Sequence, residues 1–364
     1  MKQEKLLALE SLRGIAAISV AFFHFNIGSH FNNDFVDNAW LMVDFFFVLS
    51  GFVIALNYMD RIKTINDLKK FQIKRFLRLY PLHLLMLFTF LGIEFAKYIA
   101  EIQFGMVANN RAFSENDFTA FIANLLLIQN WSLSGLTYNF PSWSISAEFL
   151  TYAIFAVLLL VSKANKIFLA TALTISIVTF GFLLNETGMG TGNLTGGPLR
   201  CLYSFSIGAL IFIIYSKLRS MSISLKNVVP LLLIAVSVSI VSQFGSKEFE
   251  YVVLIPILFG ITILSIALDN KESILNKTLS RKWLVYLGTI SYGIYMIHAC
   301  VWWILTQTMR FVFKVPNMTD SEGKIRIVIE NIFIADLVSI LGIFVVILLA
   351  HFSFKFYESK FTYR

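Results

Sequence analysis

Residues 9–25, with the sequence LESLRGIAAISVAFFHF, form an apolar stretch that is long enough to enter a bilayer. It carries Arg13 near its start and His24 near its end. At about 1.5 Å of rise and 100° of rotation per residue, the two side chains lie roughly 16 Å apart in depth and within about 20° on one helix face. Ionisable groups inside a membrane are costly and usually line a pathway or a pocket. This stripe predicts one wall of a functional site, whose other walls must come from other helices.

The composition is typical of a polytopic membrane protein. Of the 364 residues, 57% are hydrophobic and 14% are charged, and the mean hydropathy of +0.73 exceeds what a soluble domain needs. The net charge of +8 is explained by basic membrane loops, so we expect no nucleic-acid partner. Cys201 and Cys300 lie in apolar segments without metal-ligand spacing, and we predict neither a disulfide nor a metal site.

An all-α fold with ten membrane helices follows from the length rule of roughly 17–25 apolar residues per span. The predicted helices are Leu9–Ile27, Trp40–Tyr58, Leu79–Ile99, Trp143–Val161, Ile167–Leu184, Leu199–Tyr215, Val228–Phe244, Tyr251–Leu268, Trp283–Gln307 and Ile332–Phe354. The apolar segment Phe118–Ile128 is too short to span, so we expect it at the interface. With ten spans, 21 of the 30 Lys and Arg fall in loops and termini on the same side of the membrane as the N-terminus. Because basic residues favour the cytoplasmic side, both termini are expected in the cytoplasm.

The most basic segment runs from Met59 to Arg78 and leads into the third predicted helix. If it is helical, Lys74, Arg75 and Arg78 lie at i, i+1 and i+4, and the two arginines share a face. One interpretation is that this segment only orients the chain and contacts anionic lipid. The other is a phosphate clamp, because a guanidinium group binds phosphate through two parallel hydrogen bonds.

Two helices that descend from the outer side bring carboxylates into the outer half of the membrane. Asp44 lies among phenylalanines, ahead of Ser50 and Gly51 at mid-depth. A buried carboxylate must pair with a donor or be protonated, and neutralising a buried cation is an alternative to a catalytic role. In the fourth helix, Glu148 belongs to a polar stripe at i+4 spacing. The stripe consists of Ser144, Glu148 and Tyr152, directly after Trp143.

The ninth predicted helix also has a polar face, with Ser291, Tyr295 and His298 at i, i+4 and i+7. A histidine in an apolar helix can also be a hydrogen-bonded packing element, and that alternative stays open for His298. Glu94 and Lys97, three residues apart, are predicted to form a structural ion pair. Asp336 and His351 receive no predicted role.

At these residues the chain resembles the acyltransferase 3 family of integral-membrane acyltransferases. The resemblance covers nearly the whole chain. It rests on residues 9–25, VDFFFVLSGF at 43–52, KRFLR at 74–78, PSWSISAEFLTY at 141–152 and GTISYGIYMIH at 288–298. Lys74 replaces the family's first arginine, which keeps the charge and loses the planar fork. We expect one membrane domain over residues 1–364. Because the chain ends ten residues after the last predicted helix, no appended SGNH-type domain is expected.

The resemblance implies O-acyl transfer, most often O-acetyl transfer, in a bacterial cytoplasmic membrane. The donor would be cytoplasmic acetyl-CoA or another acyl-CoA, and the acceptor a hydroxyl of an extracytoplasmic cell-surface or lipid-linked glycan. His24 would be the general base, with Asp44 or Glu148 fixing its tautomer. The residues assigned to the donor are Arg13, Lys74, Arg75, Arg78, Ser50 and Gly51. Those assigned to the acceptor are Trp143, Ser144, Tyr152, Ser291, Tyr295 and His298.

Three alternatives stay open at this point. The reaction could pass through a covalent acyl-histidine at His24. A proton-coupled transporter could use His24, Asp44 and Glu148 as a relay, although the absence of an internal repeat and the few mid-helix breaks count against it. The fold could also only carry the acyl group across the membrane for another protein to use.

Overall fold

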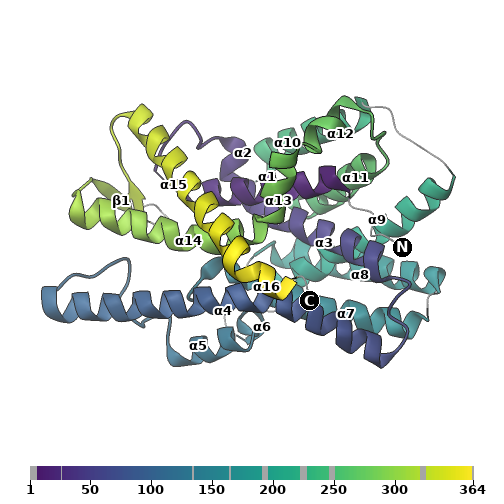
Figure 1. The fold of residues 1–364 in the computed structure, drawn as a ribbon, viewed down its shortest axis with the longest axis horizontal. Helices are drawn as coiled ribbons and strands as arrows, with labels where there is room; N and C mark the ends of the chain where they lie inside the picture. Colours follow the sequence, from purple (N-terminus) through teal and green to yellow (C-terminus); the bar gives the residue numbers. More distant parts are fainter. Residues whose placement is uncertain are drawn as a thin grey trace.

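The computed structural model describes residues 6–25, 27–132, 135–163, 165–190, 196–221, 228–245, 251–319 and 325–362. These residues form helices and loops, with a single two-stranded antiparallel hairpin among them. Most of the long helices run along the long axis of the molecule (Figure 1).

The bounds of the elements are as follows. The longer helices are α1 (Leu7–His24), α3 (Met42–Tyr58), α4 (Ile65–Phe104), α7 (Trp143–Ser162), α8 (Lys166–Thr187), α9 (Gly197–Ser220), α10 (Val228–Phe244), α11 (Ile255–Ala267), α14 (Ser291–Gln307) and α15 (Ile332–Ser353). The shorter ones are α2 (Asp34–Asp37), α5 (Phe118–Leu125), α6 (Gln129–Ser132), α12 (Ile274–Leu279), α13 (Lys282–Thr289) and α16 (Ser359–Thr362). The 3₁₀ turns are η1 (Ala39–Leu41), η2 (Phe140–Ser142) and η3 (Val252–Leu254), and the π-helical turns are η4 (Thr308–Val312) and η5 (Phe354–Glu358). Strands β1 (Asn317–Thr319) and β2 (Ile325–Ile327) form the hairpin.

Within the described residues, seven helices are long and apolar enough to cross a membrane, or eight if a bent pair counts as one span. The all-α membrane class is therefore confirmed, while the count of ten spans and the position of the termini stay predictions. The ninth predicted helix is broken, because α13 and α14 meet at an angle of 64°. Helices α10 and α11 are apolar but shorter than the seven.

The basic segment before the third predicted helix is itself largely helical. Helix α4 begins at Ile65, behind a capping box formed by Thr64 and Asp67, and ends at Gly105 in the left-handed conformation. Its 40 residues correspond to about 60 Å, roughly twice the hydrocarbon thickness of a bilayer. The basic residues of α4 therefore belong to one continuous helix that is longer than the membrane core is thick.

Helices α3 and α9 pack with their backbones in contact. A Cβ on Gly51 would overlap the backbone of Phe205, and one on Gly208 would overlap that of Val48. Small residues allow such close approach between membrane helices. Gly51 therefore packs against α9 and is not among the residues that line the cavity described below, so its place in the donor site stays a prediction.

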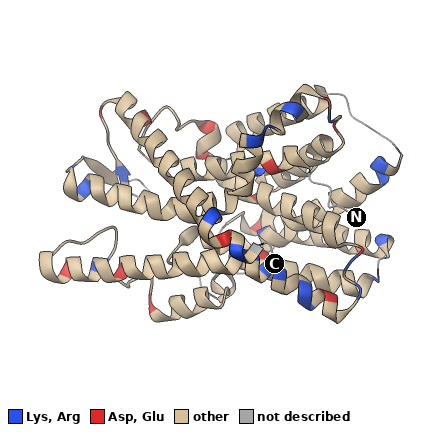
Figure 2. Cartoon of the chain, viewed as in Figure 1, with Lys and Arg blue, Asp and Glu red and all other residues tan. Residues whose placement is uncertain are grey.

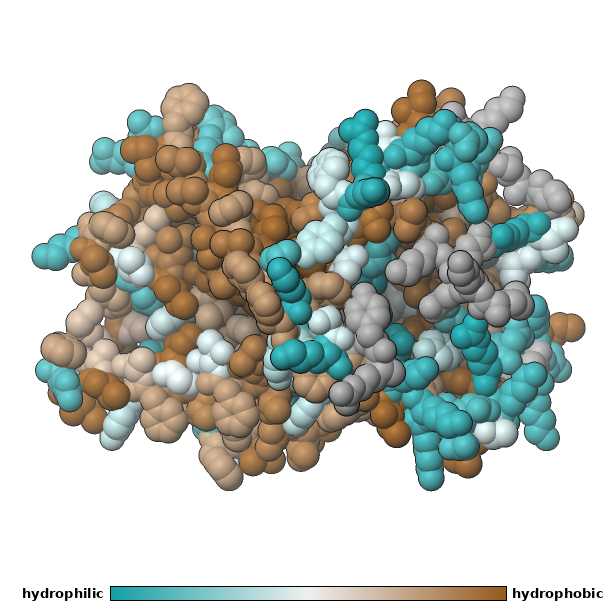
Figure 3. All heavy atoms as spheres, viewed as in Figure 1, coloured by the Kyte–Doolittle hydropathy of each residue, from teal (hydrophilic) through white to brown (hydrophobic). Residues whose placement is uncertain are grey.

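Basic and hydrophobic residues are unevenly distributed along the long axis of the molecule. Figure 2 shows Lys and Arg gathered toward the right of the view, where the N-terminus lies. Figure 3 shows hydrophobic atoms over the left and centre of this face and hydrophilic atoms toward the right. This separation has the sense expected for a membrane protein with a basic cytoplasmic side.

Candidate active site

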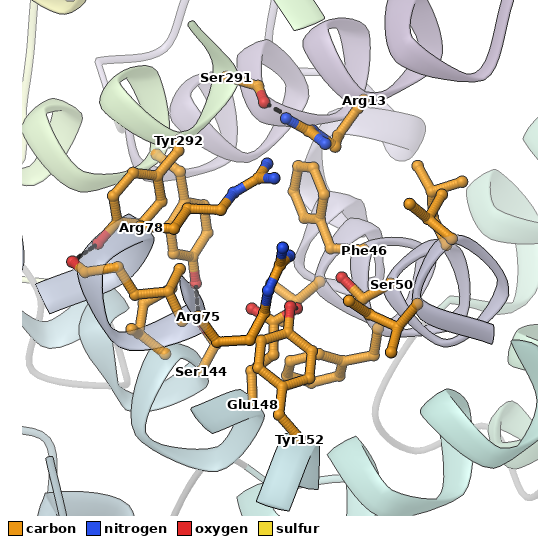
Figure 4. A pocket seen from close by; sticks show the side chains of 18 residues that line it. Arg13, Phe46, Ser50, Arg75, Arg78, Ser144, Glu148, Tyr152, Ser291 and Tyr292 are labelled. Carbon is orange, nitrogen blue, oxygen red and sulfur yellow. Dashed lines mark hydrogen bonds between the residues drawn. The ribbon is translucent and has the colours of Figure 1, made fainter. Parts of the chain in front are cut away.

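Side chains from five helices line a cavity of about 770 Å³, a volume that includes the open solvent at its mouth (Figure 4). The polar stripes predicted on separate helices meet in it. Its polar and ring-bearing lining includes Arg13 from α1, Phe46 and Ser50 from α3, Arg75 and Arg78 from α4, Ser144, Glu148 and Tyr152 from α7, and Ser291, Tyr292 and Tyr295 from α14.

Arg13 is held in place by its surroundings. Its Nε donates to Ser291 Oγ at 3.0 Å and its Nη2 to the Gly288 carbonyl at 3.2 Å. Nη2 also lies 3.3 Å from the Glu10 carboxylate. Because Gly288 lies in the last turn of α13 and Ser291 begins α14, the bend between these helices brings both acceptors to one guanidinium group.

The other two arginines retain hydrogen-bonding capacity. Arg75 Nη2 donates to the Tyr58 hydroxyl at 3.3 Å, and the guanidinium carbon lies 5.5 Å from the Tyr58 ring centre. Its Nε is buried without a hydrogen-bond partner. Among the described residues, Arg78 has no hydrogen bond or ion pair. Glu148 is the one carboxylate in the lining, against three arginines. The cavity is therefore suited to an anion with several negative charges.

Hydroxyl groups occupy the opposite wall. The Tyr152 hydroxyl donates to Glu148 Oε1 at 2.5 Å. Toward the start of α7, the hydroxyls of Ser144 and Tyr295 lie 2.8 Å apart, and both contact the Pro141 carbonyl. The Pro141 carbonyl therefore fixes the Tyr295 side chain at the edge of the cavity.

His24 lies at the end of α1 and contacts His298. His24 Nδ1 lies 3.0 Å from His298 Nε2 and 3.0 Å from the Val20 carbonyl. The fully buried His298 places its own Nδ1 3.3 Å from the Ile294 carbonyl. A carbonyl oxygen can only accept, so each Nδ1 carries a proton and His298 Nε2 is an acceptor. In this arrangement the lone pair of neutral His24 is on Nε2.

The histidine pair lies beside the cavity but does not line it. The cavity lining does not include His24 or His298. Tyr295 lines the cavity, and its ring lies 5.8 Å from that of His298 and 6.0 Å from that of Phe46. The arginines and the histidines thus lie at two separate levels, as predicted, with aromatic side chains between them.

Asp44 has a different partner from the one predicted. Its carboxylate, fully buried, accepts from Arg200 Nε at 2.9 and 3.0 Å and from Ser204 Oγ at 3.1 Å. The guanidinium carbon of Arg200 lies 4.7 Å from the Trp40 ring centre and 5.5 Å from that of Trp143. Asp44 therefore neutralises a buried cation, the alternative that the sequence left open, and it does not fix the His24 tautomer.

Sequence reasoning missed Arg200, although one signal was present. It is a single basic residue at the start of an otherwise apolar helix, and such a residue needs a buried counter-charge. Trp143 covers this ion pair and does not line the cavity. Lys74 is exposed and also lies outside the lining, so its predicted contact with the donor is not supported.

Other predicted groups have clear partners. Lys97 Nζ lies 2.9 Å from Glu94 Oε1, so the predicted structural pair is confirmed, and the pair is buried. His298 is bonded to His24 as described above. Asp336 contacts His30 at 2.8 Å, and His351 contacts the Tyr286 hydroxyl at 2.7 Å.

A helical membrane-spanning fold around a cationic cavity defines a polytopic membrane protein with a buried binding site. A model of the acyltransferase 3 family, described as an acyltransferase domain, matches residues 6–358. The chain therefore belongs to this family, as the resemblance implied.

Two relatives show the range of the family. Acyltransferase MdmB of Streptomyces mycarofaciens is 32% identical over 164 residues, which are 42% of this chain and 38% of that protein. Peptidoglycan O-acetyltransferase OatA of Listeria monocytogenes is 23% identical over 320 residues, which are 80% of this chain and 48% of that protein. The chain thus spans half or less of either relative. No solved structure matches the chain.

Proposed function

We propose that this protein moves an acyl group, in the simplest case acetyl, from cytoplasmic acyl-CoA to a hydroxyl of an extracytoplasmic glycan. The membrane would be the cytoplasmic membrane of a bacterium. The observation that carries the proposal is the cavity with three arginines and one carboxylate, next to the contact between His24 and the buried His298. The name of the relative OatA, a peptidoglycan O-acetyltransferase, supports a glycan acceptor.

The arginines would bind the phosphates of the donor. Acyl-CoA carries several phosphate charges, and planar guanidinium groups match phosphate oxygens. Arg75 Nε and the Arg78 guanidinium group supply donors for these oxygens, while Arg13 is held by α13 and α14 as a fixed charge. Ser50, Ser291 and Tyr152 line the same cavity, so they are assigned here to the donor side.

His24 would act as the general base. Its Nε2 takes the proton of the acceptor hydroxyl while the hydroxyl oxygen forms a bond to the thioester carbonyl carbon. The carbon–sulfur bond then breaks, and the proton passes to the sulfur of coenzyme A. His298 is a positioning residue, because it accepts from His24 Nδ1 and so keeps the lone pair on Nε2.

The aromatic side chains between the cavity and the histidines must move during transfer. Tyr295 and Phe46 lie at that boundary, so the acyl group reaches His24 only when their rings swing aside. The gate would limit hydrolysis, because it keeps the thioester from the outer side until the acceptor is in place.

The test is acyl transfer by purified protein in lipid nanodiscs, with labelled acetyl-CoA and soluble peptidoglycan fragments. We expect His24→Ala to lower kcat by about 10²- to 10⁴-fold. Arg78→Ala should raise the KM for acetyl-CoA about 10-fold or more. Lys70→Ala, an exposed change on the same helix, is the matched control and should leave both constants unchanged.

Two results would replace this mechanism. Stoichiometric label on His24 in the absence of acceptor would show an acyl-enzyme in place of direct transfer. Substrate flux across a vesicle membrane without any acyl donor, with no acyl transfer, would support the transporter alternative.

A further inference from the structure

A second, smaller recess lies beside the histidine pair. It measures about 180 Å³, open solvent included, and is lined by side chains of α6, η2, the start of α7 and the segment ahead of η2. Gln129, Thr137, Phe140 and Trp143 are among its lining residues, and no lining residue is ionisable. This recess differs in kind from the cavity, whose lining holds three arginines.

The recess and the donor cavity lie on two sides of one short stretch of chain. Trp143 lines the recess and the next residue, Ser144, lines the cavity. Phe140 lines the recess too, and its ring contacts the His24 ring edge-on, with the centres 4.9 Å apart. A molecule in the recess would therefore approach His24 from a different direction than a molecule in the cavity.

Gln129 lines this recess and carries an amide oxygen without a hydrogen-bond partner. Its side chain is 5% exposed, and Nε2 lies 3.2 Å from the Ser142 carbonyl and 3.3 Å from Ser142 Oγ. Because a carbonyl only accepts, the amide nitrogen must face Ser142 and the oxygen must face away. That oxygen, Oε1, is buried without a hydrogen-bond partner. A buried acceptor of this kind is unfavourable until a donor fills it.

The geometry points to this recess as the binding site for the hydroxyl-bearing edge of the acceptor sugar. The inference rests on the proposed function and names the place where its acceptor binds. A sugar hydroxyl would donate to Gln129 Oε1, and the rings of Phe140 and Trp143 would cover the apolar face. An uncharged lining favours a neutral group over a phosphate.

The experiment compares two variants of the recess with a matched control. Gln129→Met removes the amide oxygen at nearly the same length. Gly135→Phe narrows the recess from a position where an added Cβ meets no atom within 4 Å. The control is Ser132→Ala, an exposed position on α6 whose hydroxyl donates to the Ile128 carbonyl directly ahead of this helix. The protein is the full chain in nanodiscs, and folding is checked by size-exclusion profile and thermal unfolding.

The expected result is a rise of about 5-fold or more in the KM for soluble peptidoglycan fragments in both recess variants. The KM for acetyl-CoA should stay within 2-fold of the parent value, because the arginine cavity is unchanged. The Ser132→Ala control should match the parent in both constants. Folded recess variants with an unchanged acceptor KM would overturn the inference and leave the proposed function intact.

A second measurement separates the recess from the reaction. Chitotetraose, an uncharged sugar probe, is titrated without acyl donor while tryptophan fluorescence is recorded, since Trp143 lines the recess. Binding that Gln129→Met and Gly135→Phe weaken would support the recess even if the parent protein transferred no acyl group, in which case only the proposed function fails. Equal binding by parent and variants, or no binding to the parent, would overturn the recess.

Discussion

Buried charges in this protein fall into two kinds at the scale of single residues. Asp44 and Arg200 satisfy one another completely, with both carboxylate oxygens bonded to the guanidinium group. Arg75 keeps a buried Nε without a partner, and Arg78 has no ion pair within the described part of the chain. A fully paired ion pair holds helices together, whereas a partly satisfied cation facing a cavity is ready to bind an anion.

The buried ion pair of Asp44 and Arg200 predicts a loss of stability when one partner is neutralised. Asp44→Asn leaves Arg200 as a buried cation without a counter-charge, which costs about 3–5 kcal/mol. The measurement is the thermal unfolding midpoint in detergent. Asp336→Asn is the control, because its partner His30 is 60% exposed and an exposed pair of this kind contributes little to stability. Equal midpoints for the two variants, with acyl transfer lost only in Asp44→Asn, would return Asp44 to a catalytic role.

The second kind predicts a loss of donor affinity without a loss of stability. Arg78→Lys keeps the charge and removes the planar fork, so we expect the KM for acetyl-CoA to rise about 10-fold. The unfolding midpoint should not fall, since Arg78 has no hydrogen bond or ion pair to lose among the described residues. A lysine variant with the parent KM would mean that the site needs only a positive charge at this position.

At the scale of elements, the contact between α3 and α9 determines where the cavity wall stands. Ser50 faces the cavity while the next residue, Gly51, faces α9. Gly208 supplies the matching gap on α9. The close approach thus sets how far the polar face of α3 stands from the arginines of α4.

The contact between α3 and α9 predicts that a side chain added at Gly208 strongly reduces the amount of folded protein. Gly208→Val places side-chain atoms where the Val48 backbone lies, so the helices must separate, and we expect a large loss of folded protein. The yield of monodisperse protein on size exclusion and its unfolding midpoint measure this. Gly92→Ala is the control, because an added Cβ there meets no atom within 4 Å, and it should stabilise α4 by about 1 kcal/mol. A stable Gly208→Val variant would show that α3 and α9 are not packed in this way.

At the scale of the whole molecule, α4 provides the test of orientation. Lys70 and Gln103 are exposed near its two ends, about 50 Å apart by helical rise. This separation exceeds the hydrocarbon thickness of roughly 30 Å, so the two positions should lie on opposite sides of the membrane. The basic residues around Lys70 predict that this end lies in the cytoplasm.

We expect Gln103→Cys to react with an impermeant maleimide added to spheroplasts, and Lys70→Cys to react only after lysis. The native cysteines are both buried, so they give a low background. The reverse labelling pattern would invert the predicted topology. Labelling of both positions from outside would mean that α4 does not cross the membrane.

Much of the helical framework was predictable, because a helix in a membrane is specified by neighbouring residues. Val228–Phe244 was predicted with the bounds that α10 has, and the stripe of Ser144, Glu148 and Tyr152 does face one cavity. The break between α13 and α14 was not predicted. The bend lies at Ile290, which is flanked by Gly288, Thr289 and Ser291, and small residues of this kind also occur in unbroken membrane helices. The length of α4 was also missed, because its basic first half looks like a loop in hydropathy.

The sequence by itself determined that the chain is a helical membrane protein with arginines and histidines on defined helix faces, since periodicity and hydropathy are local properties. Only the tertiary structure decided the partners: His24 lies against His298, Asp44 against Arg200, and Tyr295 between the cavity and the histidines. The physical reason is that many lateral orders of helices satisfy the same hydropathy. Contacts between residues far apart in sequence, such as the close approach at Gly51, select one of them.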